Sequence, residues 1–267
     1  MGNKPFKRVI AIIISMAMLI ACVQVNVFAA TVEPHVVINQ AYGGGGNSGA
    51  LYKNDFIELF NPTDSPVDMS GWTVQYASAK GAFGEFITKI PDKTEIKARG
   101  FYLIQEAAGD GGTVDLPGPD CTGDIKMGAS AFKIALVSNG DAATGLKDPD
   151  VVDFLGAGTA SAYEGNNAAP APNAATAVVR KTTGVDTNDN GVDFKTATPE
   201  PRDSDSPIVP AAPETKCATP TANPASGNIE AGTKIVFATA TAGAEIQYST
   251  TASDGPWTDE TDVVVNA

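Results

Sequence analysis

Histidine is almost missing from this sequence of 267 residues, since His35 is the only one. Zinc sites of the HExxH type and histidine-rich metal centres need at least two imidazoles and are therefore excluded. A serine–histidine–aspartate triad within this chain is argued against as well, because the one imidazole stands close to the expected mature N-terminus. We expect His35 to be neither a metal ligand nor a catalytic residue.

Positive charge and cysteine are also scarce. Lys and Arg number 18 against 31 Asp and Glu, which gives a formal net charge of −13. Affinity for nucleic acid comes mostly from Lys and Arg, so we expect no direct nucleic-acid binding. The acidic balance suits an extracellular protein that its charge keeps soluble. Cys121 and Cys217 follow the N-terminal leader, and a disulfide between them is permitted outside the cell but not required.

No segment shows convincing helical periodicity over ten or more residues, and short apolar runs take its place. Trp72, Val74 and Tyr76 alternate with polar residues, which is the period of a half-buried strand. Comparable runs stand at 35–42, 56–60, 86–87, 101–104, 132–137, 151–155 and 178–180, with turn-forming residues between them. Many short strands separated by turns predict an all-β, antiparallel sandwich or barrel.

The first 30 residues have the pattern of a secretory signal peptide. A basic start is followed by an apolar run over 9–21, and residues 27–30 then supply small residues at the −3 and −1 positions of a cleavage site. We therefore expect an extracellular protein, released or associated with the cell surface, after cleavage behind Ala29 or Ala30. Two other interpretations stay open: a lipid anchor on Cys22, and an uncleaved anchor over 9–30.

Composition divides the rest of the chain. Residues 31–204 hold the strand pattern described above, and 205–216 form an acidic, proline-rich stretch typical of an extended linker. A second β module is expected over 217–267, with strands near 234–237, 245–249 and 262–265. It is about half as long as an immunoglobulin-type sandwich, so we expect it to be partial and the chain to be the N-terminal piece of a longer protein.

Several motifs in order carry a resemblance over about 35–204. They are the glycine-rich loop after 36–42, the segments NDFIELFN at 54–61 and VDMSGW at 67–72, and later DFLG at 153–156 and DTNDN at 186–190. In this order they resemble a lamin-tail domain of the bacterial secreted type. The resemblance implies an immunoglobulin-like β-sandwich. Residues 217–267 resemble the small β-sandwich module at the C-termini of chitobiase-like glycosidases.

Both kinds of module are similar to accessory units of secreted nucleases, nucleotidases and other phosphoesterases. The resemblance therefore implies a non-catalytic region that holds a downstream phosphoesterase or nuclease near a polymer, envelope or membrane surface. A surface or adhesion protein built of β modules, without an enzyme, is the alternative. A lone hydrolase that uses carboxylates of the first domain is a third, weaker interpretation.

Two motifs invite a ligand. Gly44, Gly46 and Gly49 satisfy G-x-G-x-x-G, but no helix follows, so we expect a flexible loop between strands and no nucleotide cofactor. Residues 186–191 copy the start of a calcium loop, yet Ala197 stands where the bidentate Glu belongs. An Asx-rich turn explains this segment best. A looser calcium site remains a candidate, with the ligands Asp186, Asn188, Asn190 and Asp193.

The remaining conspicuous side chains favour structural roles. We expect Trp72 in the core, and Trp257 is the better candidate for an exposed aromatic. Asp55 and Glu58 are three apart in a strand and point to opposite faces, so they cannot pair as glycosidase carboxylates. Arg180 and Arg202 are expected to pair with carboxylates of strands or turns.

Overall fold

The computed structural model describes residues 33–211, 221–223, 233–238, 247–248, 258–259 and 262–264. The leader, the Cys22 lipid site, Cys217, Trp257 and most of the second module lie outside these residues. The chain divides into two compact units, of which one comprises Ala29–Ala211. No helix of the described residues is long and apolar enough to cross a membrane.

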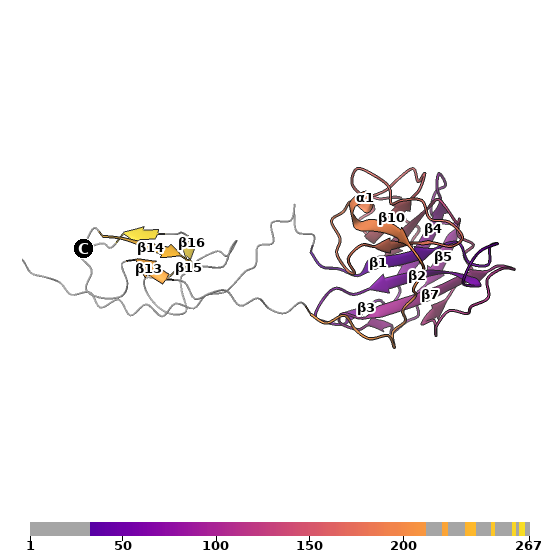
Figure 1. The fold of residues 1–267 in the computed structure, drawn as a ribbon, viewed down its shortest axis with the longest axis horizontal. Coiled ribbons are helices and arrows are strands. Elements are labelled where there is room, and N and C mark those ends of the chain that lie inside the picture. Colours follow the sequence, from indigo (N-terminus) through magenta and orange to yellow (C-terminus); the bar gives the residue numbers. More distant parts are fainter. Residues whose placement is uncertain are drawn as a thin grey trace, which may run out of the picture. The chain divides into compact units, whose positions relative to one another are not determined.

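The first unit is built of short strands and one helical turn (Figure 1). The strands are β1 (Val37–Tyr42), β2 (Asn54–Phe60), β3 (Val67–Asp68), β4 (Thr73–Ser78), β5 (Phe86–Lys89), β6 (Glu95–Ile96), β7 (Phe101–Ala108), β8 (Cys121–Thr122), β9 (Phe132–Val137), β10 (Val151–Ala157), β11 (Ala177–Arg180) and β12 (Phe194–Ala197). The helix α1 spans Asn190–Asp193. This confirms the predicted all-β class, and each apolar run predicted between residues 35 and 180 overlaps a strand.

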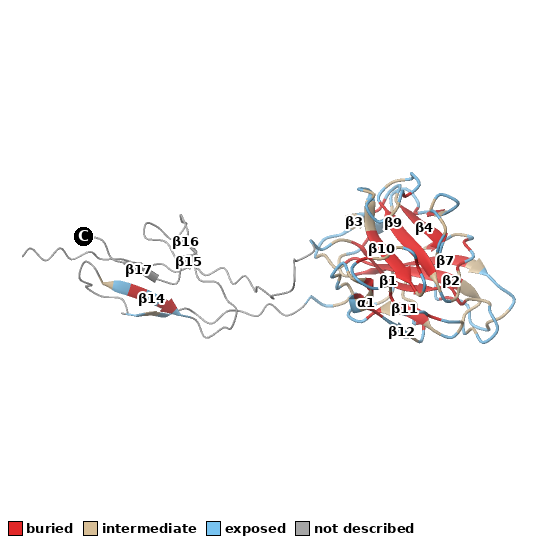
Figure 2. Ribbon diagram, turned by 90° about the horizontal axis from the view of Figure 1, so that it is seen from above, coloured by how far each residue is buried: buried red, intermediate tan, exposed pale blue. Residues whose placement is uncertain are grey.

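Two sheets make the sandwich. One has the strand order β12-β11-β1-β2-β7-β8 and the other has the order β10-β9-β4-β5, while β3 and β6 form a small ribbon. Every pair is antiparallel except β7 with the short β8. Buried residues fill the central strands (Figure 2). The main core joins Ile57 and Leu59 of one sheet to Ile134 and Leu136 of the other.

A β-bulge in β1 shapes the region that matters below. The pairing of β1 with β2 shifts between Ile38 and Gln40, and the residue between them is Asn39. A bulge inserts one residue and reverses the face of every side chain that follows. Val36, Ile38 and Ala41 therefore all lie in the main core. Without the bulge, Ala41 would face the opposite side of the sheet from Ile38, because it lies three residues further along the strand. Pairing of β1 with β11 covers only Gln40 and Ala41, so the backbone of Ile38 lies beyond that ladder.

Residues after β12 remain attached to the first unit. The Ser204 N–H donates to the Asp120 carboxylate at 3.0 Å, and the Val209 N–H donates to the Arg99 carbonyl at 2.9 Å. The Val209 side chain packs against the cluster of Val37, Phe60 and Phe101. Part of the stretch that composition assigns to the linker thus lies against the sandwich.

The described part of the second unit is also made of strands. The strands β13 (Thr221–Asn223), β14 (Lys234–Ala238) and β17 (Asp262–Val264) form one sheet, and β15 (Gln247–Tyr248) pairs with β16 (Thr258–Asp259). In β14 the buried Ile235 and Phe237 alternate with exposed neighbours, so one face of the strand is covered. The kinship of this module with chitobiase-like domains stays a prediction.

Candidate functional site

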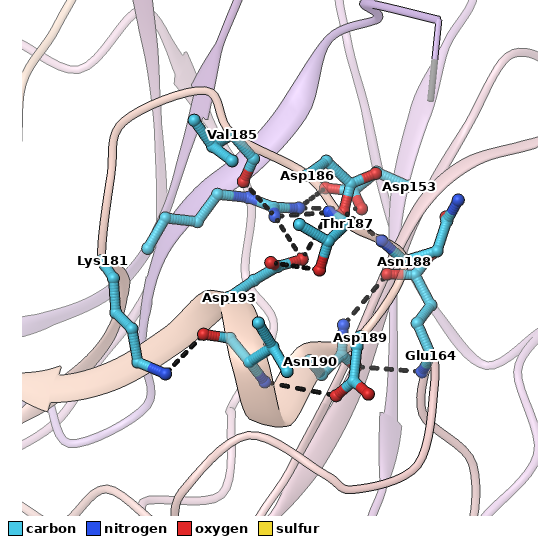
Figure 3. A network of polar contacts seen from close by, with 12 residues as sticks. Asp153, Glu164, Lys181, Val185, Asp186, Thr187, Asn188, Asp189, Asn190 and Asp193 are labelled. Atoms are coloured by element: carbon cyan, nitrogen blue, oxygen red, sulfur yellow. Dashed lines mark hydrogen bonds and ion pairs between the residues drawn. The ribbon is translucent and has the colours of Figure 1, made fainter. Parts of the chain in front are cut away.

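A dense cluster of polar side chains surrounds the guanidinium of Arg180, at the end of β11, and Figure 3 labels its partners Asp153, Asp186 and Asp193. The Arg180 side chain has no exposed surface. Its Nη2 donates to both oxygens of Asp153, at 3.1 and 2.9 Å. Its Nε donates at 2.9 Å to the carbonyl of Ile38, which the β1–β11 ladder leaves unpaired. The Ile38 N–H donates to Asp153 in turn, so Arg180 and Asp153 together satisfy the backbone beside the bulge.

The loop 181–193 closes over the other side of the guanidinium. Nη1 of Arg180 donates to the Val185 carbonyl at 3.0 Å, to Asp186 Oδ1 at 3.2 Å and to Asp193 Oδ2 at 3.3 Å. Asp193 also accepts the N–H and the hydroxyl of Thr187, at 2.9 and 2.7 Å. The two acidic residues of the predicted calcium set, Asp186 and Asp193, are therefore gathered around a guanidinium that the protein itself supplies.

The two asparagines of the predicted calcium set do not join these carboxylates. Asn190 is fully buried, and its Oδ1 accepts the N–H groups of Gly156 and Glu164 at 2.8 and 3.2 Å. Its Nδ2 donates to the Phe154 carbonyl and to Glu164. Asn188 is exposed and adopts a left-handed backbone with φ of 53°. Calcium binding by the four residues stays a prediction; in this structure Asp186 and Asp193 share a partner and the asparagines lie apart.

Electrostatics around Arg180 are dominated by burial and by the nearby carboxylates. Burial, together with the charges of Asp153 and Asp186, raises the pKa of Glu164 to about 9, so Glu164 is protonated near neutral pH. Burial also raises the pKa of Asp193. Burial alone would lower the pKa of Arg180, but the carboxylates of Asp153 and Asp186 more than offset it and raise that pKa. The guanidinium is therefore permanently charged.

His35 lies at the rim of this cluster, which sequence reasoning did not foresee. Its Nε2 stands 3.5 Å from Asp186 Oδ2, and its Nδ1 stands 2.9 Å from the carbonyl of Glu33. One ligand atom each from His35, Asp153 and Asp186 fall within 4.8 Å of one another. The three residues are more than 30 positions apart, so only the fold brings them together.

A second candidate is a cleft of about 630 Å³ lined by residues of β1, β11 and β12 and by the loops beside them. Among the residues that line it are Tyr52, Lys195, Thr198 and Glu200. Burial, and then the charge of Glu200, raises the pKa of Tyr52. The Tyr52 hydroxyl therefore stays protonated at physiological pH. The cleft offers an aromatic ring, a hydroxyl, an ammonium and a carboxylate to a polar ligand.

The glycine-rich loop joins β1 to β2, as expected for a connection between strands, but it is closely packed rather than free. The Gly45 N–H donates to Asp55 Oδ1 at 2.8 Å. A side chain at Gly45 would meet the backbone of Asn54 at 2.0 Å, and one at Gly46 would meet Gly109 at 2.2 Å. These glycines allow two backbones to touch, and no phosphate-binding geometry is needed to explain them.

The pairing predicted for the two arginines is confirmed, whereas Trp72 lies at the edge of the core rather than inside it. Arg202 pairs with the fully buried Glu58 at 2.9 Å and lies over the Phe101 ring at 3.9 Å from its centroid. Arg180 pairs with Asp153 at 2.9 Å. Trp72 packs against the main core while remaining half-buried.

These observations define a class: an immunoglobulin-like β-sandwich module. Residues 29–167 match the lamin tail domain family, so the chain belongs to that family. The matched region ends before β11, so Arg180 and the loop 181–193 follow it. Searching the curated proteins finds no match. A solved DUF4876 family protein from Bacteroides thetaiotaomicron VPI-5482 is similar at 11% identity over 67% of this chain and 75% of that chain, with a TM-score of 0.46.

Proposed function

We propose that this chain is a non-catalytic accessory module of a secreted protein, which holds an attached phosphoesterase or nuclease near an extracellular polymer or the cell envelope. The lamin tail family supports the role of a non-catalytic module. Secretion and the tethering of an attached enzyme rest on the resemblance drawn from the sequence and on the acidic net charge of −13.

One observation carries the non-catalytic interpretation: the buried carboxylates of Asp55 and Glu58, on β2, are engaged in holding the sandwich together. Asp55 accepts the N–H groups of Gly45 and Met127, both at 2.8 Å. Glu58 accepts the guanidinium and the backbone N–H of Arg202. Carboxylates that bridge loops in this way have few lone pairs left for a substrate. Asp55 and Glu58 therefore act as structural groups.

The cleft beside Tyr52 is the surface we assign to the polymer. An aromatic ring next to hydroxyl, ammonium and carboxylate groups can stack on a sugar ring and hydrogen-bond its hydroxyls. We therefore expect a polysaccharide rather than a nucleic acid, whose phosphates the acidic surface would repel.

A sedimentation assay tests the assignment. The purified protein is mixed with insoluble polysaccharides, including peptidoglycan and cellulose, and the bound fraction is measured. We expect retention on at least one polymer, at least tenfold weaker in Tyr52→Ala. Phe86→Ala is the control, because Phe86 is also an aromatic residue, 39% exposed, but lies on β5 of the other sheet. Equal retention of both variants would remove the cleft from the proposal.

Catalysis is tested separately on the same preparation, with DNA, nucleotides and soluble glycans as substrates. We expect no turnover by this chain. Turnover that disappears in Asp55→Asn or Asp153→Asn, while the variant keeps its circular dichroism spectrum, would overturn the non-catalytic interpretation.

A further inference from the structure

One buried carboxylate oxygen beside Arg180 has no hydrogen-bond donor. Asp186 Oδ1 accepts from Arg180 and from the Asn188 N–H, but Oδ2 accepts no hydrogen bond, although the side chain is only 5% exposed. A buried acceptor without a partner costs free energy comparable to a lost hydrogen bond. The group that faces Oδ2 is Nε2 of His35, 3.5 Å away.

In the neutral imidazole of His35, a lone pair of Nε2 faces Asp186 Oδ2, and no N–H points at this oxygen. Nδ1 of His35 lies 2.9 Å from the Glu33 carbonyl, which can only accept a hydrogen bond, so Nδ1 carries the proton. In the neutral ring Nε2 is then an acceptor, and two acceptors face each other. A metal-ligating histidine is usually oriented in this way, by donating its other N–H to a carbonyl.

The spacing fits two ligands of one small cation. Zinc bonds to nitrogen and carboxylate oxygen are about 2.0–2.2 Å long, so two tetrahedral ligands lie about 3.4 Å apart. The 3.5 Å between Nε2 and Oδ2 matches this separation and exceeds the usual length of about 2.7–2.9 Å for an ion-pair hydrogen bond. Asp153 supplies a third oxygen within 4.8 Å of both.

Charge favours a divalent ion at this position. Asp153, Asp186 and Asp193 surround a single guanidinium, and the Asp153 and Asp193 side chains are at most 2% exposed. Asp153 and Asp186 together carry one negative charge more than the guanidinium balances, and Asp193 adds to this excess whenever it is ionised. A divalent cation would offset the excess, whereas burial of uncompensated carboxylates is costly.

We propose that His35 Nε2, Asp186 Oδ2 and one oxygen of Asp153 bind a divalent transition-metal ion of the zinc type. Asp153 would exchange one of its contacts with Arg180 Nη2, Ile38 N–H or Phe154 N–H for the metal. The His35 side chain is 25% exposed, which leaves a path to solvent for the ion and for a water ligand. The ion would fasten the segment before β1 to the loop 181–193.

The test uses the whole protein with a histidine-free affinity tag, so that His35 is the sole imidazole. Cys22 and Cys217 are replaced by serine, because thiolates also bind zinc, whereas Cys121 is buried in the core and is kept. Zinc chloride is titrated at pH 7.5 and followed by calorimetry and by the NMR signals of the imidazole. We expect one site per chain, a shift of the imidazole signals, and a rise in unfolding temperature on zinc addition.

Matched variants decide whether His35 and Asp186 belong to the site. His35→Ala, at the rim of the sandwich, should bind zinc at least tenfold more weakly and lose the thermal shift. Asp186→Asn keeps an oxygen for Arg180 and should lose the same affinity. Asp92→Asn, at an exposed position away from the cluster, should bind as the unchanged protein does. Equal zinc affinity in His35→Ala, or imidazole signals that do not move at saturation, would overturn the proposal. Stabilisation by calcium but not by zinc would also overturn it.

Discussion

At the scale of single residues, the guanidinium of Arg180 connects segments that are distant in the sequence. It contacts the carbonyl of Ile38, the carboxylate of Asp153 and two carboxylates of the loop 181–193. Its plane also lies over the Phe194 ring, 4.5 Å from the centroid. A planar cation with five N–H donors suits this arrangement, which a lysine ammonium could not reproduce.

Removal of this cation should destabilise the first unit strongly. Arg180→Met keeps most of the side-chain volume but leaves three buried carboxylates without their common partner, so we expect a loss of about 3–5 kcal/mol. The measurement is urea unfolding followed by tryptophan fluorescence. Arg99→Met is the matched control, because Arg99 pairs with Asp64, whose side chain is 76% exposed, and should cost less than about 1 kcal/mol. Equal losses in both variants would contradict the structural role of Arg180.

Glu106 should make stability depend on pH. Burial raises its pKa to about 7, although hydrogen bonds from Thr88 and Ile125 oppose this shift. Between the ordinary glutamate pKa of about 4.3 and 7, the folded protein therefore holds a proton that the unfolded chain has released. Stability from this group is complete below that range and is lost as the pH rises through 7, by up to about 3 kcal/mol.

The variant Glu106→Gln isolates this contribution, since it mimics the protonated form. We expect its unfolding free energy to fall less than that of the unchanged protein between pH 4.5 and 8. Glu95→Gln, an exposed substitution in β6, should leave the pH dependence as it is. Parallel pH profiles for Glu106→Gln and the unchanged protein would show that Glu106 ionises normally in the folded state.

At the scale of elements, the loop between β1 and β2 depends on backbone contacts that exclude any side chain. Gly45→Ala would place a methyl group 2.0–2.3 Å from backbone atoms of Asn54 and Asp55. The loop or β2 would have to move to relieve this overlap. We expect destabilisation of about 3 kcal/mol or more, or failure to fold. Gly140→Ala is the control, because nothing lies within 4 Å of its added carbon, and its unfolding midpoint should hardly change.

The elements themselves could be predicted from the sequence, whereas the site could not. Apolar alternation is local, so runs such as 132–137 and 151–155 locate β9 and β10 closely. The bulge at Asn39 is different, because it is defined by its partner strand. Likewise, the motif at 186–191 predicts oxygen ligands, but the sequence gives no sign that the Arg180 guanidinium occupies the place beside Asp186. Pairing of Arg180 with a carboxylate was foreseeable in kind, but the approach of His35 to Asp186 requires the folded sheet.

At the scale of the whole molecule, the boundary of the first unit is set by packing rather than by composition. Proline and acidic residues suggest a linker from 205, yet Val209 fills a place beside Phe60 and Phe101. Lys97 also donates through Nζ to the Ser204 carbonyl at 2.7 Å. Extended chain without regular structure can therefore belong to a domain when its backbone donors and acceptors are satisfied by that domain.

Two truncations measure where this boundary lies. A chain that ends after Ala211 keeps every described core contact of the first unit, so we expect its unfolding midpoint to match that of the whole protein within about 2 °C. A chain that ends after Asp203 loses the Ser204 bonds to Asp120 and the cover that Val209 gives to Phe60. Its midpoint should fall by about 5 °C or more, since about 1–2 kcal/mol of burial and hydrogen bonding is removed. Differential scanning calorimetry of both chains is the measurement, and identical midpoints would return the boundary to residue 204.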